Sequence, residues 1–382
     1  MASSVIIIGG GISGTATAWE LARNGISVTL LEKGDLASMA SGWTLAGVRQ
    51  SGRHPAELPL AEAAVRRWEG LADELGADVE YRQQGNLRLA LAESDVPIIK
   101  QVVADGNAVG IDMTWIDGAA AVHEIAPALT SELVGASFCA TDGHANPTKT
   151  VHAFAAAARR AGADICTGVE VTGIEVVHER VTGVRTTDGV LPTERVIVAA
   201  GVYAPWLLAP LGIGVPMQIV LVSAIQTEVR EPMLAQVLGI PTGGFAGRQQ
   251  ADGRFRLTGS SVPWNESHQT ADNVMPPLSQ LADVIAWTKR LIPGLADVRA
   301  VKIWSGLIDK TPDALPVIEA SPEVGGLVIA TGFSGHGFCL GPVTGEILAD
   351  LTIEGTTRHP IAPFARARLD GVGFDEGITL HG

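Results

Sequence analysis

The chain has 382 residues, which is enough for two compact units with sizeable cores. Its 27 Lys and Arg residues against 41 Asp and Glu residues give a net charge of −14, which repels phosphate backbones, so we expect no nucleic-acid partner. Cys139, Cys166 and Cys339 have neither a paired nor a metal-binding spacing, so we expect no disulfide framework, no metal site and a reducing, cytoplasmic location.

The composition and the first 32 residues indicate an α/β protein. Hydrophobic residues make up 46%, charged residues 18%, and 45 glycines are present, which is typical of a buried parallel sheet with many tight turns. The apolar run 5–8 predicts a strand, 12–24 predicts a helix that Gly25 ends, and 26–32 predicts a second strand. The chain therefore opens with a βαβ unit.

The rest of the chain mixes helical and extended patterns. Helical periodicity predicts further helices over residues 61–75, 151–161, 278–291 and 342–351. Apolar or alternating runs predict strands over residues 85–91, 163–177, 181–187, 195–201 and 326–332. Asp252-Gly253 predicts a hairpin turn, and the short alternating runs after about residue 80 favour antiparallel sheet. Two architectures are thus interleaved along the chain, and the glycine-rich and proline-rich apolar runs predict no transmembrane helix.

A glycine fingerprint follows the first strand. Gly9, Gly11 and Gly14 have the spacing that allows a tight turn, a close approach to a pyrophosphate and close packing of helix on strand. Glu32 ends the second strand, where a carboxylate accepts hydrogen bonds from ribose hydroxyls. Because no second fingerprint occurs, the pattern favours one dinucleotide held as a prosthetic group, with FAD as the leading cofactor.

Six segments in order resemble the FAD-dependent amine and amino-acid oxidoreductases of the D-amino-acid oxidase superfamily, in the glycine oxidase and sarcosine oxidase branch. The segments are 5–14, 30–34, 40–50, 196–207, 304–318 and 330–351. The resemblance implies a Rossmann-like FAD-binding domain interleaved with an antiparallel-sheet α+β substrate domain. The FAD-binding domain would comprise residues 1–80, 150–210 and 301–382. The substrate domain would comprise residues 81–149 and 211–300.

The resemblance also implies which residues contact FAD. At the pyrophosphate and ribose they are Gly9, Gly11, Ile12, Ser13, Gly14, Glu32 and Lys33. In the loop that would run past the pyrophosphate and the flavin ring, the contact residues are Ala40, Ser41, Thr44, Leu45, Ala46 and Gly47. At adenine and the closing wall they are Val171, Ala200, Gly201 and Trp206. At the flavin they are Gly306, Gly332, Gly335, His336, Gly337, Phe338 and Cys339.

Departures from the family pattern bear on the chemistry. Trp43 stands where some relatives carry a flavin-linking histidine, and the Trp304 segment has no flavin-linking cysteine, so FAD is expected to be non-covalent. Ile308 replaces an arginine of glycine oxidase, and Cys339 replaces a second cationic anchor of sarcosine oxidase, which argues against simple glycine-like recognition. Residues 255–288 contain no lysine, which favours a dehydrogenase over a fast oxidase.

Arg49 and His336 are the candidate catalytic residues. Arg49 matches a substrate-binding arginine of the sarcosine oxidases, and His336 is expected either to contact flavin or substrate or to be a simple loop residue. Residues expected to be mainly structural in the substrate lid are Arg254, Arg256, Trp264 and His268.

The expected activity is oxidation of an amino acid or N-substituted amino acid, with O2, a quinone or a partner protein as electron acceptor. Two alternatives remain open. One is a 2-hydroxy-acid dehydrogenase, because hydride can also leave an alcohol carbon. The other is the flavin subunit of a hetero-oligomeric amine dehydrogenase.

Overall fold

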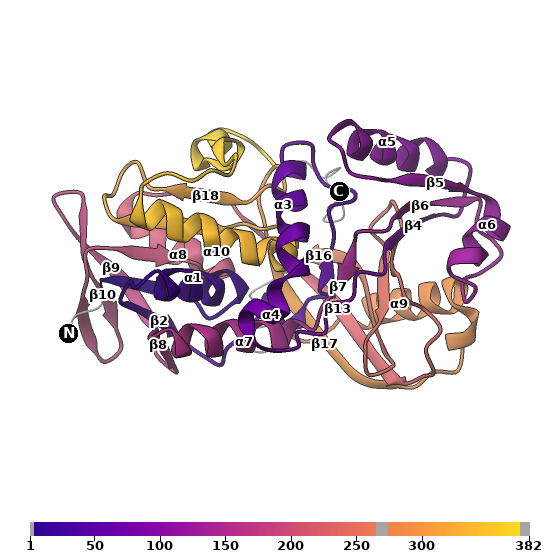
Figure 1. The fold of residues 1–382 in the computed structure, drawn as a ribbon, viewed down its shortest axis with the longest axis horizontal. Helices are drawn as coiled ribbons and strands as arrows, with labels where there is room; N and C mark the ends of the chain where they lie inside the picture. The colour runs from indigo at the N-terminus through magenta and orange to yellow at the C-terminus, as the bar shows by residue number, and fades with distance from the viewer. Residues whose placement is uncertain (1–3, 265–273, 375–382) are drawn as a thin grey trace.

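The computed structural model describes residues 4–264 and 274–374. Two main sheets lie at opposite ends of an elongated molecule (Figure 1). The six-stranded sheet is parallel except for its edge strand β18, which is antiparallel to β19. Its strands, in spatial order, are β18 (Val317–Ala320), β19 (Leu327–Thr331), β12 (Val196–Val198), β1 (Val5–Ile8), β2 (Val28–Glu32) and β8 (Asp164–Thr167).

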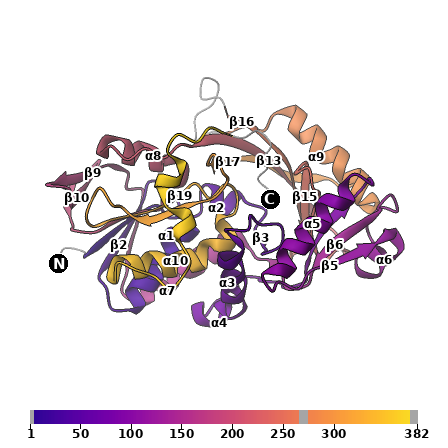
Figure 2. The same cartoon turned by 90° about the horizontal axis from the view of Figure 1, so that it is seen from above.

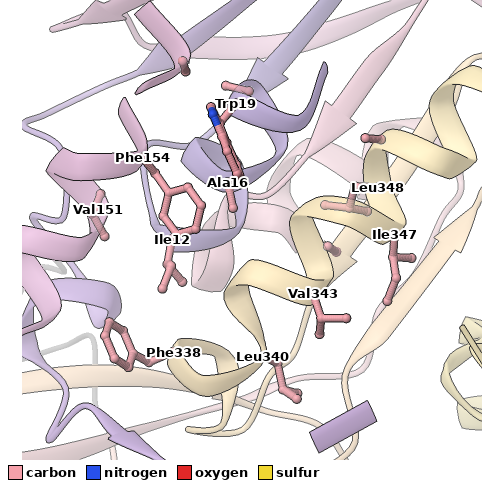
Figure 3. Packing of buried hydrophobic residues seen from close by; sticks show 14 of the residues in the cluster. Ile12, Ala16, Trp19, Val151, Phe154, Phe338, Leu340, Val343, Ile347 and Leu348 are labelled. Atoms are coloured by element: carbon pink, nitrogen blue, oxygen red, sulfur yellow. The ribbon is translucent and has the colours of Figure 1, made fainter. Parts of the chain in front are cut away.

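Three helices cover one face of the six-stranded sheet: α1 (Ile12–Arg23), α7 (Pro147–Arg160) and α10 (Gly337–Ile353). Figure 3 shows the apolar side chains of α1 and α10 packed against each other. Gly341 and Gly345 allow the two helices to approach closely. A Cβ on Gly341 would lie 2.6 Å from the side chain of Ile12, and a Cβ on Gly345 would lie 2.6 Å from the side chain of Ala16. The glycines inside α10 therefore hold it tightly on α1.

A smaller sheet and a short helix pack near the other face. The sheet has the order β11 (Gly189–Pro192), β10 (Arg180–Thr186) and β9 (Val171–Val177). Apolar residues from these strands, from β1 and β12, and from α8 (Ala204–Leu208) form one buried cluster. The six-stranded sheet is thus covered on both faces, as expected for parallel strands.

The second main sheet is mostly antiparallel and has eight strands. In spatial order they are β17 (Ala300–Lys310), β13 (Gln218–Val229), β16 (Arg254–Pro263), β15 (Phe245–Gln249), β14 (Val237–Gly239), β4 (Asn86–Ala90), β6 (Gly135–Cys139) and β5 (Thr114–Asp117). Figure 2 shows β13, β16 and β17 arching from this sheet toward the other end of the molecule. Residues of α9 (Leu278–Leu291) and α6 (Gly118–Ile125) share a buried cluster with one face of the sheet, and α5 (Asp95–Ala108) contacts β4, β5 and β6.

The remaining elements are short helices, strands and turns. They are α2 (Ala40–Trp43), β3 (Gly47–Val48), α3 (Leu58–Glu69), α4 (Leu71–Leu75) and β7 (Gly143–His144), with 3-10 turns at Gly201–Tyr203, Ala209–Leu211, Pro293–Leu295, Ala362–Phe364 and Arg366–Leu369. β3 pairs with β7, so the segment after α2 is hydrogen-bonded to the segment between β6 and α7. No helix among the described residues has the length and apolar character needed to cross a bilayer.

The predicted α/β class is confirmed, as are the opening βαβ unit, the hairpin after β15 and helix α9. The helix predicted from Pro342 begins instead at Gly337, because Pro342 is accommodated within the helix rather than starting it. The strand predicted over 163–177 is split where Gly168 adopts φ +74°. The single helix predicted over 61–75 is two helices that meet at Gly70, and α5 and α6 were not predicted.

The predicted domain segments remain a prediction, and two strand pairings cross them: β3 with β7, and β17 with β13. β17 falls within the segment 301–382 that was assigned to the FAD-binding domain, but it pairs with β13 in the antiparallel sheet. The departure has a physical reason, since β17 pairs with β13 along its whole length, from Ala300 to Lys310, before the chain returns to the six-stranded sheet at β18.

Candidate functional site

One cavity of about 590 Å³ lies between the two main sheets. From the six-stranded sheet it is lined where strands end, by Ile8, Glu32, Ala199 and Ala330. From the antiparallel sheet it is lined by residues of β4, β14, β15, β16, β13 and β17. Ligands of open parallel α/β sheets bind outside the carboxyl ends of the strands, which is the position of this cavity.

The glycine fingerprint forms the turn between β1 and α1. Gly9 has φ +115°, and a Cβ on Gly9 would lie 2.3 Å from the carbonyl oxygen of Ala199. A Cβ on Gly14 would lie 2.0 Å from the carbonyl oxygen of Gly9, so Gly14 lets the helix pack on the turn. The backbone N–H of Ile12 donates to Ser41 Oγ at 3.0 Å. The positive end of the α1 dipole thus faces the cavity, as a pyrophosphate site requires.

The Glu32 carboxylate is fixed at the same edge of the sheet. Its Oε2 accepts the N–H of Gly10 at 2.6 Å and its Oε1 accepts the N–H of Gly34 at 2.7 Å. Beside it, the Lys33 ammonium lies 3.6 Å from the centre of the Tyr203 ring. Glu32 lines the cavity, and each of its carboxylate oxygens can accept a further hydrogen bond. The position therefore suits a ribose hydroxyl as donor.

A second helix begins at the cavity. His336 is the N-cap residue of α10, and the first turn consists of Gly337, Phe338 and Cys339. His336 Nδ1 lies 2.9 Å from Glu57 Oε2, and both side chains are buried. The positive end of the α10 dipole and the His336 ring therefore face the cavity together.

Arg49, Arg53 and Arg88 line the cavity near His336; Arg53 and Arg88 are buried, and Arg49 is half-buried. Arg53 Nε donates to the carbonyl oxygen of Arg49 at 3.2 Å, and its Nη1 lies 3.6 Å from Glu57 Oε1. Burial, together with Arg53 and Arg88, holds the pKa of Arg49 well below its usual value. Burial and Arg53 lower the pKa of Arg88 to about 10. The cluster is a desolvated cationic site suited to a carboxylate.

Comparison with known proteins places the chain in a family. Residues 4–351 match the model of the family described as FAD dependent oxidoreductase. The chain belongs to this family. It is similar to a glycine oxidase of Geobacillus kaustophilus, with 28% identity over 96% of the chain and 97% of the relative. It is also similar to a sarcosine oxidase subunit beta of Arthrobacter, with 30% identity over 96% of the chain and 91% of the relative.

Solved structures agree with this membership. The L-proline dehydrogenase from P. horikoshii superposes with a TM-score of 0.90 at 28% identity, covering 98% of the chain and 99% of that protein. The chain is therefore an FAD-dependent oxidoreductase with the fold of this family, and the predicted family, cofactor and enzyme class are confirmed.

Most of the residues that the family resemblance singled out lie around the one cavity. Those that line it are Gly9, Gly11, Ile12, Ser13, Glu32, Lys33, Ala40, Ser41, Thr44, Leu45, Gly47, Arg49, Val171, Ala200, Gly201, Trp206, Gly306, Gly335, His336, Gly337 and Phe338. Their individual roles toward FAD stay predictions. The geometry brings together segments that are far apart in the sequence, which is the arrangement that a bound dinucleotide needs.

Four of the predicted FAD contacts stand behind the cavity wall. Gly14 packs on Gly9, and Ala46 is buried with its N–H bonded to Thr44 Oγ1. A Cβ on Gly332 would lie 2.4 Å from the Thr311 side chain. Cys339 is buried, and its carbonyl oxygen accepts the indole N–H of Trp68 at 2.8 Å. These residues shape the wall, so any effect of theirs on the cofactor would be indirect.

Sequence reasoning missed several residues at the cavity. Arg53, Glu57 and Arg88 were not among the predicted site residues, because none of them belongs to a recognised motif. Arg256, expected to be structural, lines the cavity and donates from Nη1 to the carbonyl oxygen of Thr44 at 2.6 Å. For Arg88, one feature of the sequence could have indicated a place in the site: it is a charged residue within an alternating, apolar strand pattern. His268 lies outside the described residues.

Proposed function

We propose that this oxidoreductase oxidises an amino acid or N-substituted amino acid at the carbon next to nitrogen, with FAD bound non-covalently. One observation carries the proposal: the cavity that begins at the glycine fingerprint continues without interruption to Arg49. The glycine turn that would bind the dinucleotide and the cation that would bind a carboxylate thus line the same cavity.

The residues present fit FAD. The α1 N-terminus and Gly11 would hold the pyrophosphate, Glu32 would accept from the ribose, and Val171 would lie at adenine. Bound FAD would accept a hydride from the carbon that bears the amine nitrogen, leaving an imine that water hydrolyses to a carbonyl compound. The α10 N-terminus would stabilise negative charge on the adjacent flavin edge, which favours reduction.

The chain's own residues would orient the substrate. Arg49, whose Nη1 donates to the carbonyl oxygens of Ser51 and Gly52, would contact the substrate carboxylate and so fix the adjacent carbon. Glu57 holds the His336 ring in place by accepting from Nδ1 when that nitrogen carries the proton. Val222, Ile240 and other apolar residues line the rest of the space and would exclude bulk water from the reacting carbon.

Non-covalent attachment is supported by the residues at the predicted flavin position. Trp43 packs against Gly306, where a Cβ would lie 3.1 Å from the indole, and Trp43 O accepts the indole N–H of Trp304 at 3.0 Å. An indole offers no nucleophile comparable to a thiolate or imidazole. Acid precipitation should release the yellow colour into the supernatant, whereas a yellow pellet would overturn this part of the proposal.

We further propose that electrons pass to a quinone or a partner protein faster than to O2. Among the described residues that line the cavity, Lys33 is the one lysine, and it lies on the side of Glu32. Stopped-flow reoxidation of the reduced protein compares a quinone or dye with O2. Faster peroxide formation than dye reduction would contradict this proposal.

The comparisons favour amine donors over 2-hydroxy acids, because the similar relatives are named glycine oxidase and sarcosine oxidase subunit beta. The latter name supports a second candidate, the flavin subunit of a hetero-oligomeric amine dehydrogenase. Steady-state turnover by the purified chain alone would argue against that candidate. A cytoplasmic location stays a prediction.

The decisive experiment is anaerobic titration of the FAD-loaded protein with a panel of amino acids, N-substituted amino acids, amines without a carboxylate, and 2-hydroxy acids. Bleaching of the oxidised flavin band by amino acids is expected. Arg49→Met should raise the concentration for half-bleaching by roughly tenfold or more, because a charge-assisted hydrogen bond is lost. Arg254→Met, on β16 and paired with Asp252, is the matched control and should behave as the parent. Bleaching by hydroxy acids alone would overturn the proposal.

A further inference from the structure

A row of residues in register crosses the antiparallel sheet on the face that lines the cavity. Arg88 on β4 pairs with Gly239 on β14, which pairs with Ala246 on β15. Ala246 pairs with Thr258 on β16, and Thr258 pairs with Ala224 on β13. All five line the cavity, so one large cation is followed by four small residues. We call Gly239, Ala246, Thr258 and Ala224 the small-residue strip.

Arg88 converges with Arg49 from the opposite wall. A Cβ placed on Gly52 would lie 2.4 Å from Arg88 Nη2 and 3.3 Å from Arg49 Nη1, so both guanidinium ends reach the same place. Arg49 comes from the loop after β3, whereas Arg88 comes from the antiparallel sheet. Two cations from different layers therefore meet at one end of the cavity.

The charges around this meeting point are unequal. Three guanidinium groups, on the buried Arg53 and Arg88 and the half-buried Arg49, lie near two buried carboxylates, on Asp142 and Glu57. Asp142 accepts the N–H of Gln50 at 2.8 Å, and Glu57 is bonded to His336. An excess of positive charge in a desolvated site is costly, and one bound carboxylate would balance it.

The space next to Arg88 is open. A Cβ on Gly239 would meet no heavy atom of the described chain within 4 Å, and the backbone of Gly239 does not require glycine. Strands lie about 4.8 Å apart, so the open space over Gly239 begins one strand away from Arg88. The neighbouring cavity residues Val237, Ile240 and Ala246 are apolar. The space therefore suits an apolar group attached near a carboxylate.

We propose that Arg88 is a second anchor for the substrate carboxylate, opposite Arg49, and that the small-residue strip receives an apolar substituent larger than a methyl group. The inference rests on the proposed function and narrows its substrate class. The substrate is an amino acid with a large apolar side chain or N-substituent, in preference to glycine or sarcosine.

The carboxylate anchor is tested by binding, without turnover. The FAD-loaded protein is titrated with the unreactive anions acetate, butyrate and 4-phenylbutyrate while the flavin absorbance is followed. Arg88→Gln should weaken the binding of all three anions by roughly tenfold to hundredfold, because hydrogen bonds to a charged group are lost. Arg254→Gln is the charge-matched control and should leave the affinities unchanged. Equal affinities for Arg88→Gln and the parent would overturn the anchor.

The strip is tested by filling it. In the parent, 4-phenylbutyrate should bind roughly tenfold more tightly than acetate, because the phenyl group leaves water. Gly239→Val should abolish that advantage and leave the affinity for acetate within about twofold. Gly214→Val, at an exposed loop position where a Cβ meets no atom of the described chain within 4 Å, is the control. Loss of FAD from Gly239→Val would show that the space belongs to the cofactor and would overturn the inference.

Failure of this inference is distinguishable from failure of the proposed function. If no amino acid bleaches the flavin, the proposed function fails whatever the anions do. If amino acids bleach the flavin but glycine does so as efficiently as phenylalanine-like substrates, and Arg88→Gln leaves the half-bleaching concentrations unchanged, only the inference fails.

Discussion

His336 Nδ1 lies 2.9 Å from Glu57 Oε2, which joins the residue that starts α10 to the residue that precedes α3. Glu57 is fully buried and also lies 3.6 Å from Arg53 Nη1. Burial works to raise the pKa of Glu57, but His336 and Arg53 outweigh burial and bring the pKa to about 2. The carboxylate is therefore ionised at neutral pH and holds two groups that line the cavity.

Glu57→Gln should lower the free energy of unfolding by about 3 kcal/mol at about pH 7, because Arg53 would keep a buried charge without its carboxylate. The folded-state pKa is below the usual value of 4.5, so the Glu57 carboxylate stabilises the fold above pH 4.5, and that stability is lost as the pH falls toward about 2. Urea unfolding at several pH values should show the difference between parent and variant shrinking across this window. Glu62→Gln, which removes an exposed pair with Arg66, is the control, and a constant difference would contradict the assignment.

Gly14→Ala should destabilise the protein by about 2 kcal/mol and lower its affinity for FAD. Alanine inside a helix normally adds about 1 kcal/mol of stability over glycine, but here the new Cβ would lie 2.0 Å from the carbonyl oxygen of Gly9. Thermal unfolding with and without FAD measures both effects. Gly214→Ala is the control, and an unchanged or raised midpoint for Gly14→Ala would show that the turn relaxes without cost.

Arg248 should be more important for stability than the half-buried Arg254. Arg248 is buried, donates from Nη2 to the carbonyl oxygen of Ala145 at 2.9 Å and from Nε to that of Leu45 at 2.5 Å. Arg248→Met would leave two buried acceptors without donors, which costs about 3 kcal/mol and loosens the loop that lines the cavity. Denaturant unfolding and FAD retention on gel filtration are the measurements. A loss no larger than that of Arg254→Met would refute the bracing role.

The three cysteines should differ in reactivity. Burial raises the pKa of Cys139 to about 12 and also raises that of Cys339, and both thiols are buried. Cys166 is partly exposed on β8. Alkylation at about pH 8 followed by peptide mass spectrometry should therefore modify Cys166 first and the other two only after unfolding. Early modification of Cys339 would show that the start of α10 opens.

Local sequence patterns were sufficient for the opening of the chain. The β-branched run before Gly9, the glycine spacing and Glu32 predicted β1, α1 and the turn between them, because each signal acts over a few residues. The predicted start of α10 was wrong because proline is favoured at the first position of a helix, whereas close packing of Gly341 and Gly345 on α1 supports a longer helix around Pro342. Tertiary contacts decided that boundary.

The sequence by itself determined the family, the FAD cofactor and the α/β class, because those depend on motifs whose spacing is fixed along the chain. Only the tertiary structure decided that Arg88 meets Arg49, that Glu57 holds His336 and that small residues from four strands form one strip. Strand order and register set these relationships, and they bring together residues whose separation in the sequence carries no signal of contact.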